Sequence, residues 1–98
     1  MLFGLFKKKR TVEELGEPIG EITHFFPHVK AAVIKLKRDG LALGDVIYIK
    51  GHTTDFEQKI KSLQLNHASV EKASKGQEIG LKVNGKVRHG DKVYKIIS

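Results

Sequence analysis

Residues 29–51, VKAAVIKLKRDGLALGDVIYIKG, decide the fold class of this 98-residue chain. Two runs rich in β-branched residues, 29–37 and 45–51, are separated by turn signals at Gly40 and Gly44. In the first run apolar and polar side chains alternate, which is typical of a strand with one buried face. The stretch therefore predicts two β-strands connected by tight turns.

The same pattern of short apolar runs and turn residues continues over the rest of the chain. Asn84-Gly85 lies between two apolar runs and predicts a β-hairpin, because both central residues of such a turn prefer positive φ. Gly44-Asp45 and Gly90-Asp91 each precede a run, and an Asp at such a place can bond the backbone two residues on. Short strands at this spacing predict an all-β fold, either a barrel or a sandwich. The expected strands are residues 19–26, 29–37, 45–51, 78–83 and 92–97.

Residues 53–72, TTDFEQKIKSLQLNHASVEK, allow two interpretations. As a helix, Thr54 and Glu57 would form a capping box, and apolar residues follow at helical spacing. As a strand, alternate residues from Phe56 to Ile60 share one face, and a β-bulge is needed to bring the later leucines into line. The all-β context favours a bent strand.

The chain is basic, with 18 Lys and Arg against 11 Asp and Glu and a net charge of +7. Residues 1–17 hold four of the basic and three of the acidic residues, so residues 18–98 carry +6. This surplus favours a polyanionic partner, RNA or the ribosome, although a solvated surface is the plainer alternative. Lysines two apart on a strand would present a charged ribbon that could follow phosphates. The candidate nucleic-acid-binding residues are Lys30, Lys35, Lys37, Arg38, Lys59, Lys61, Lys82, Lys86 and Arg88.

Aromatic residues could add stacking on bases wherever they are exposed. We expect Tyr48 and Phe56 in the core instead, because a small barrel needs large side chains. The aromatic candidates are Phe25, Phe26, Tyr48, Phe56 and Tyr94.

Signals for catalysis and for metal binding are weak. The chain has no cysteine, which excludes disulfides, a thiol nucleophile and a Cys-ligated zinc site. His24 and His28 are four residues apart, but Pro27 between them argues against a helix that would align the rings. Neither a G-x-S-x-G nor a G-x-x-x-x-G-K-[ST] string occurs. We therefore expect no enzyme, no cofactor, no metal and no nucleoside triphosphate.

Residues 1–17 differ in composition from the rest and predict a short flexible tail before a domain at 18–98. Apolar and then basic residues at Leu2–Arg10 would suit an anionic membrane surface, but we favour a tail without membrane contact. The order is the reverse of a secretory signal, and no apolar run reaches the ~18–20 residues of a membrane helix. The expected location is the cytoplasm.

The glycine turns follow one another as they do in a known family of domains. The motifs are Gly20-x-Ile22, Leu41-x-x-Gly44-Asp45, Gly76-x-x-Ile79-Gly80 and Gly90-Asp91-x-Val93. Their order resembles the second domain of translational GTPases such as elongation factor Tu, which is a small β-barrel. The closer resemblance is to a variant of this barrel, the C-terminal domain of collagenase-like bacterial peptidases. It is carried by THFFP (23–27), TTDFEQ (53–58) and GQEIGLKV (76–83) and covers roughly residues 18–97.

The resemblance implies a small closed antiparallel barrel of six to seven strands, without the catalytic domain that accompanies it in either family. In the GTPases this barrel touches ribosomal RNA and the aminoacyl end of tRNA. We therefore predict a non-catalytic module, similar to that of elongation factors, that binds RNA or the ribosome through its basic surface. The alternative is a protein-docking module that pairs with a separately encoded enzyme or translation component.

Overall fold

The computed structural model describes residues 15–96, which form two antiparallel β-sheets. The larger sheet has eight strands in the order β5-β4-β10-β1-β2-β9-β6-β7, and the smaller pairs β3 with β8. The strands are β1 (Gly20–Phe26), β2 (Ala31–Leu36), β3 (Leu41–Ala42), β4 (Val46–Lys50), β5 (Asp55–Lys59), β6 (Gln64–Leu65), β7 (Ala68–Ser69), β8 (Lys72–Ala73), β9 (Glu78–Lys82) and β10 (Lys92–Ile96). All five strands expected from the β-branched runs are present, within two residues at each end.

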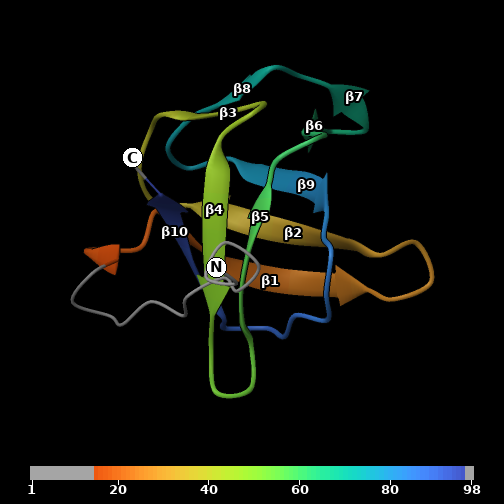
Figure 1. The fold of residues 1–98 in the computed structure, drawn as a ribbon. Helices are drawn as coiled ribbons and strands as arrows, with labels where there is room; N and C mark the ends of the chain where they lie inside the picture. The colour runs from red at the N-terminus through yellow and green to blue at the C-terminus, as the bar shows by residue number, and fades with distance from the viewer. Residues whose placement is uncertain (1–14, 97–98) are drawn as a thin grey trace, which may run out of the picture.

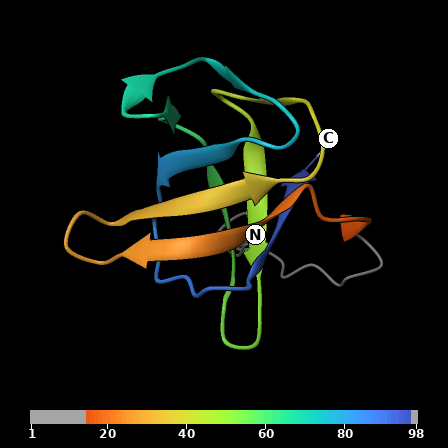
Figure 2. The same ribbon diagram turned by 180° about the vertical axis from the view of Figure 1, so that it is seen from behind.

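The larger sheet is strongly coiled, so that its two halves face each other. Strands β4 and β5 run across β1, β2 and β9, and β10 connects the two groups by pairing with both β4 and β1 (Figure 1). The reverse view shows β1, β2 and β9 as one layer with β4 behind it (Figure 2). Alternation places Ile34 and Leu36 of β2 and Ile79 of β9 inside, each at most 1% exposed. The core therefore fills the space between the two halves.

The prediction of a closed barrel is wrong, because no sheet closes on itself. The edge strands of the larger sheet are β5 and β7, and β6 pairs with β9 only at Gln64 and Gly80. The chain leaves the β5 ladder at Lys59 and turns away toward β6. A side chain, that of Gln58, spans the resulting gap between β5 and the end of β9. It donates from Nε2 to the Lys82 carbonyl (2.9 Å) and accepts from the Asn84 N–H (2.7 Å).

Residues 53–72 contain no helix: residues 55–65 form a bent, extended stretch, as the bent-strand interpretation predicted, and a turn at Asn66-His67 follows it. Strand β5 pairs with β4 on one edge of the larger sheet, and β6 pairs with β9 toward the other. Residues 60–63 between them carry the chain across. Ile60 and Leu63 are buried at 2% and 1% exposure, which shows that both ends of this crossing face the core.

Three turns of one construction lead into β4, β9 and β10. In the turn at 42–45, the Asp45 N–H donates to the Ala42 carbonyl (3.1 Å), and the Asp45 carboxylate accepts from the Ala42 N–H (2.9 Å). The turn at 88–91 repeats both contacts at 3.0 and 2.8 Å, and the turn at 74–77 repeats them with a Gln amide at 3.1 and 2.8 Å. The side chain thus bonds three residues back, not two residues on. The third residue of each turn is a glycine with positive φ: Gly44 (+91°), Gly76 (+89°) and Gly90 (+93°).

The hairpin predicted at Asn84-Gly85 is absent. Strand β9 pairs with β2 and β6, and β10 pairs with β1 and β4, so the two apolar runs do not form a ladder. A two-residue hairpin turn lies instead at Asn66-His67, where both residues have positive φ (51° and 68°), as in a type I′ turn. Asn66 is a residue typical of the first position of such a turn, but the second position holds a histidine where glycine is usual.

Several predictions for the N-terminus concern residues 1–14, which lie outside the described residues. They include the flexible tail and the membrane contact through Leu2–Arg10. The part of the predicted tail that is described joins the fold, because Leu15 is 8% exposed and packs with Tyr48 and Tyr94. The domain boundary at residues 17 and 18 stays a prediction.

Candidate functional site

The nine predicted basic residues all lie on the surface, but they do not form one patch. Lys35 is on β2, Lys37 directly follows it, and Lys59 is on β5, with β4, β10 and β1 between these strands in the sheet. Three of the nine are engaged within the domain. Lys37 pairs with Glu21 (2.9 Å), Arg38 pairs with Glu17, and Lys82 donates to the Val29 carbonyl (2.9 Å).

Acidic side chains lie beside Lys35 and Lys37. Lys35 lies opposite Glu21 of β1 in one ladder and opposite Glu78 of β9 in the other. Glu21 also contacts Lys92 at 3.6 Å. This face therefore alternates in sign and does not form the continuous cationic ribbon that the lysine spacing suggested.

The carboxyl of Glu21 gives this part of the surface a pH dependence. A hydrogen bond from Lys37, followed by the charge of Lys92, lowers its pKa below the ordinary value of 4.5. A lowered pKa in the folded state means that the pairing stabilises the fold above that ordinary value and is lost as pH falls through the folded pKa. We expect Glu21→Gln to be slightly less stable than the parent at pH 7 and equal to it at about pH 2, in urea unfolding followed by circular dichroism. An equal difference at both pH values would contradict this.

Lys30 and Lys86 are the two predicted residues that the structure brings together at a cavity. A pocket of about 520 Å³ lies between the β1–β2 loop and the segment after β9. We call it the lysine pocket, and its lining is Phe25, Pro27, Lys30, Val83, Asn84, Gly85 and Lys86. Its floor is apolar and its lining holds no carboxylate.

A second depression, here called the outer groove, crosses the solvent side of β2 and β9. Its floor contains Ala31, Val33 and Gly80. Val33 lies opposite Gly80 in the β2–β9 ladder, so no side chain of β9 covers it from that side. One wall is formed by the end of β1 and the β1–β2 loop, where Phe26 and Val29 are 49% and 54% exposed. Adjoining hollows of about 350 and 270 Å³ share Val29, Ala31, Gln64 and Gly80 and make the groove continuous.

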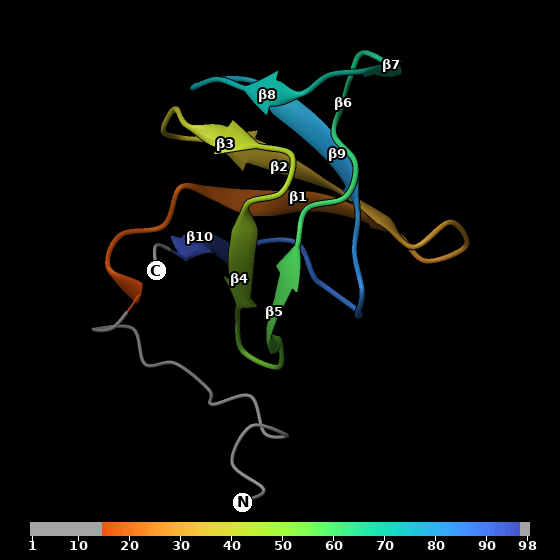
Figure 3. The same cartoon turned by 45° about the horizontal axis from the view of Figure 1, so that its top comes forward.

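The other wall of the outer groove is the β6–β7 hairpin, which lies on the same side of the molecule as the β1–β2 loop (Figure 3). Gln64, Asn66 and His67 line the groove here. The side-chain amides of Gln64 and Asn66 make no hydrogen bond to any other residue of 15–96. Free amides beside an apolar floor can bond the peptide groups of an extended chain.

The aromatic candidates divide between core and surface. Tyr48 and Tyr94 are 2% and 5% exposed, which confirms the core placement of Tyr48, and Phe25 and Phe56 pack partly buried against the core. Phe26 alone is an exposed aromatic in residues 15–96. Its ring stacks on His24, with centroids 6.1 Å apart and planes 6° apart.

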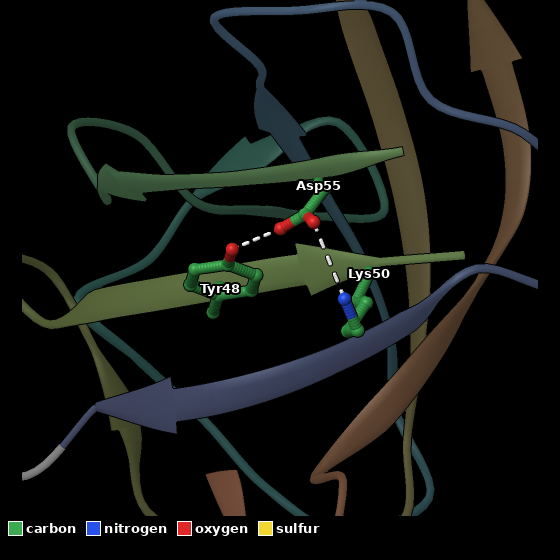
Figure 4. A network of polar contacts seen from close by, with 3 residues as sticks. All are labelled: Tyr48, Lys50 and Asp55. Atoms are coloured by element: carbon green, nitrogen blue, oxygen red, sulfur yellow. Dashed lines mark hydrogen bonds and ion pairs between the residues drawn. The ribbon is translucent and has the colours of Figure 1, made fainter. Parts of the chain in front are cut away.

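A polar cluster connects the ends of β4 and β5. The Tyr48 hydroxyl donates to one Asp55 carboxylate oxygen, and the Lys50 ammonium contacts the other at 3.2 Å (Figure 4). Leu15 and Tyr94 pack against Tyr48, so the cluster covers the second, smaller core. Its groups satisfy one another, which indicates a structural role.

Two further observations concern the described part of the chain. Within residues 15–96, no three His, Cys, Asp or Glu side chains lie together to hold a metal ion. The same residues contain no helix of the length and apolarity required to cross a membrane.

The chain is similar to proteins that carry peptidase names. It is 47% identical over 77 residues to an uncharacterized protease of Methanocaldococcus jannaschii, and 33% identical over 100 residues to a collagenase of Porphyromonas gingivalis. These matches cover 78% and 83% of this chain but only 19% and 28% of the relatives, so the chain spans less than a third of their length. No family model matches the chain.

Solved structures support the same assignment of the fold. The chain superposes on the C-terminal domain of a proposed U32 peptidase from Geobacillus thermoleovorans with a TM-score of 0.77 and 19% identity. That match covers 90% of this chain and 98% of the solved domain. A selenomethionine variant of the same domain gives a TM-score of 0.76. At this identity the likeness establishes a shared fold.

The resemblance to collagenase-like peptidases is therefore confirmed, and two predictions are corrected. The names of the relatives point to a peptidase-related domain, so the prediction of a translation-factor-like module that binds RNA or the ribosome is wrong. The expectation of no enzyme is corrected by the same names, because the relatives are a protease and collagenases. The likeness to the second domain of elongation factor Tu receives no support from these matches.

The outer groove was not predicted from the sequence, because the candidate site residues were all selected for their positive charge. The one available signal was Gly80, an isolated glycine inside a strand, which often marks a close approach of another chain. Phe26 and Val29 were assigned to a strand end and a strand start, with no indication that their side chains stay in solvent.

Proposed function

We propose that this chain takes part in peptide-bond cleavage as the β-sheet domain of a peptidase-type protein, and that the outer groove holds the polypeptide. The observation that carries the proposal is the placement of two large exposed apolar side chains, Phe26 and Val29, along a groove floored by Ala31, Val33 and Gly80. The protease and collagenase names of the relatives support it.

The occupant that the groove fits is an extended polypeptide. Small floor residues leave room for a backbone to lie close to the sheet, and the amides of Gln64 and Asn66 can bond its peptide groups. The stacked His24 and Phe26 rings offer a flat apolar face of the kind that proline-rich segments use. Gelatin, which is unfolded collagen, is a suitable probe of this chemistry.

We expect Phe26→Ser/Val29→Ser to bind labelled gelatin at least about tenfold more weakly than the parent in fluorescence anisotropy, because most interface energy resides in a few apolar anchors. Both side chains are about half exposed, so the fold is expected to remain intact. Leu43→Ser is the matched control, since Leu43 is 42% exposed and lies outside the groove. Gelatin binding that is equal in both variants, or absent in the parent, would refute the proposal.

A further inference from the structure

The lysine pocket lies on the opposite side of the β1–β2 loop from the outer groove. Val29 of this loop lines the groove and Lys30 lines the pocket. The pocket has the volume of a few side chains, with Phe25, Pro27 and Val83 as its apolar part. It therefore differs from the groove in shape and in charge.

The wall that carries Lys30 is fixed by the backbone. Lys30 has a φ of +50°, an uncommon value for a residue with a side chain, and its N–H contacts the Pro27 carbonyl at 3.3 Å. The Lys30 carbonyl in turn accepts from the Val83 N–H at 2.9 Å. This last bond ties the loop to the opposite wall and sets the width of the pocket.

The wall that carries Lys86 is fixed by two core-facing side chains. Gln58, which is 4% exposed, holds the Asn84 N–H at 2.7 Å. The Phe56 ring lies so close to Gly85 that a Cβ there would be 3.2 Å from it. Lys86 is the next residue, so its side chain extends from a backbone segment whose position is fixed.

The two ammonium groups are unpaired. Neither the Lys30 ammonium nor the Lys86 ammonium makes a hydrogen bond or an ion pair with another residue of 15–96. Elsewhere on the described surface, Lys37, Lys50 and Lys95 each contact a carboxylate. Two unpaired cations around an apolar floor are complementary to a carboxylate carried next to an apolar group.

We infer that the lysine pocket binds the C-terminal residue of a polypeptide. The terminal carboxylate lies between Lys30 and Lys86, and the last side chain packs on Phe25, Pro27 and Val83. A C-terminal residue carries both groups on one Cα, whereas an internal acidic residue carries its carboxylate on the side chain and leaves the apolar contact to a neighbour. The inference rests on the proposed function, since cleavage of a peptide bond creates a new C-terminus.

The test uses the full chain and three acetylated tripeptides at low ionic strength. The first ends in leucine as a free acid, the second is its C-terminal amide, and the third is an amide with a glutamate before the leucine. Binding is measured by NMR from the backbone amides of Lys30, Val83 and Lys86. We expect the free acid to bind and both amides to bind at least about tenfold more weakly, because charge-assisted hydrogen bonds are lost.

Variants separate the pocket from the general positive charge. Lys30→Gln/Lys86→Gln is expected to weaken the free acid about tenfold or more, and Lys59→Gln/Lys72→Gln, which removes two exposed lysines outside the pocket, to leave it unchanged. Equal binding of acid and amide, equal binding of the glutamate peptide, or no binding of the acid would each overturn the inference. A failure of the proposed function can be distinguished from a failure of this inference. If the outer groove does not bind polypeptide, Phe26→Ser/Val29→Ser leaves gelatin binding unchanged, while binding of the free-acid peptide still requires Lys30 and Lys86.

Discussion

Replacing Gly20 by alanine is expected to destabilise the domain by about 3 kcal/mol or more, the upper part of the range for overpacking in a core. Gly20 lies where β1 pairs with both neighbours, opposite Val93 of β10 and Leu36 of β2. A Cβ at this position would be 2.5 Å from the Lys35 carbonyl oxygen and 2.9 Å from the Ile34 methyl. Both neighbours belong to β2, so only a shift of the strand itself could relieve the clash.

Urea unfolding of the two proteins, followed by circular dichroism, measures this difference. Gly80→Ala is the matched control, because Gly80 is also inside a strand and its added Cβ would find the nearest atom at 3.9 Å. We expect Gly80→Ala to change the free energy of unfolding by less than about 1 kcal/mol. Alanine loses less conformational entropy than glycine on folding, which offsets the small cost of placing the new methyl group. Similar midpoints for Gly20→Ala and Gly80→Ala would show that the close approach at Gly20 does not govern stability.

The contrast between these two glycines shows how far the sequence determines the fold. Strand positions followed from alternation and from β-branched residues, as in Ala32, Ile34 and Leu36 of β2, because burial on one face imposes that period. Turn positions followed from Gly44 and Gly90, which take positive φ. What Gly20 and Gly80 contact depends on strands distant in sequence, so their different roles are visible only in the folded chain.

Local sequence signals did not predict that the larger sheet stays open. Asn84-Gly85 has the residues of a hairpin turn, but its flanking runs find other partners in β2 and β4. Pairing partners are selected by the whole set of strands, and a local turn preference does not outweigh a ladder. The candidate sites show the same limit. Lys30 near a strand end and Lys86 beside the Asn84-Gly85 turn were predicted as surface residues, but their shared pocket depends on the contact of the β1–β2 loop with Val83, far along the chain.

Gln58 is the residue that most directly replaces the missing closure, and its loss carries the second large expected effect. Gln58→Leu keeps a side chain of similar size but leaves the Lys82 carbonyl and the Asn84 N–H without their partner. Leaving buried polar groups unsatisfied costs about 1–3 kcal/mol each, and water can reach part of this site, so we expect a total loss of about 2–3 kcal/mol. Hydrogen exchange adds a local readout: the Asn84 amide should exchange faster relative to the core amides of β4.

Gln64→Leu provides the control, because Gln64 is exposed and its amide makes no hydrogen bond within residues 15–96. Gln58→Glu gives a finer test, since its carboxylate still accepts from the Asn84 N–H but cannot donate to the Lys82 carbonyl. We expect its stability to fall between those of the parent and Gln58→Leu at neutral pH. If Gln58→Leu is as stable as Gln64→Leu and exchange at Asn84 is unchanged, the gap between β5 and β9 is held by apolar packing of Phe56 on Gly85, and the Gln58 bridge is incidental to the fold.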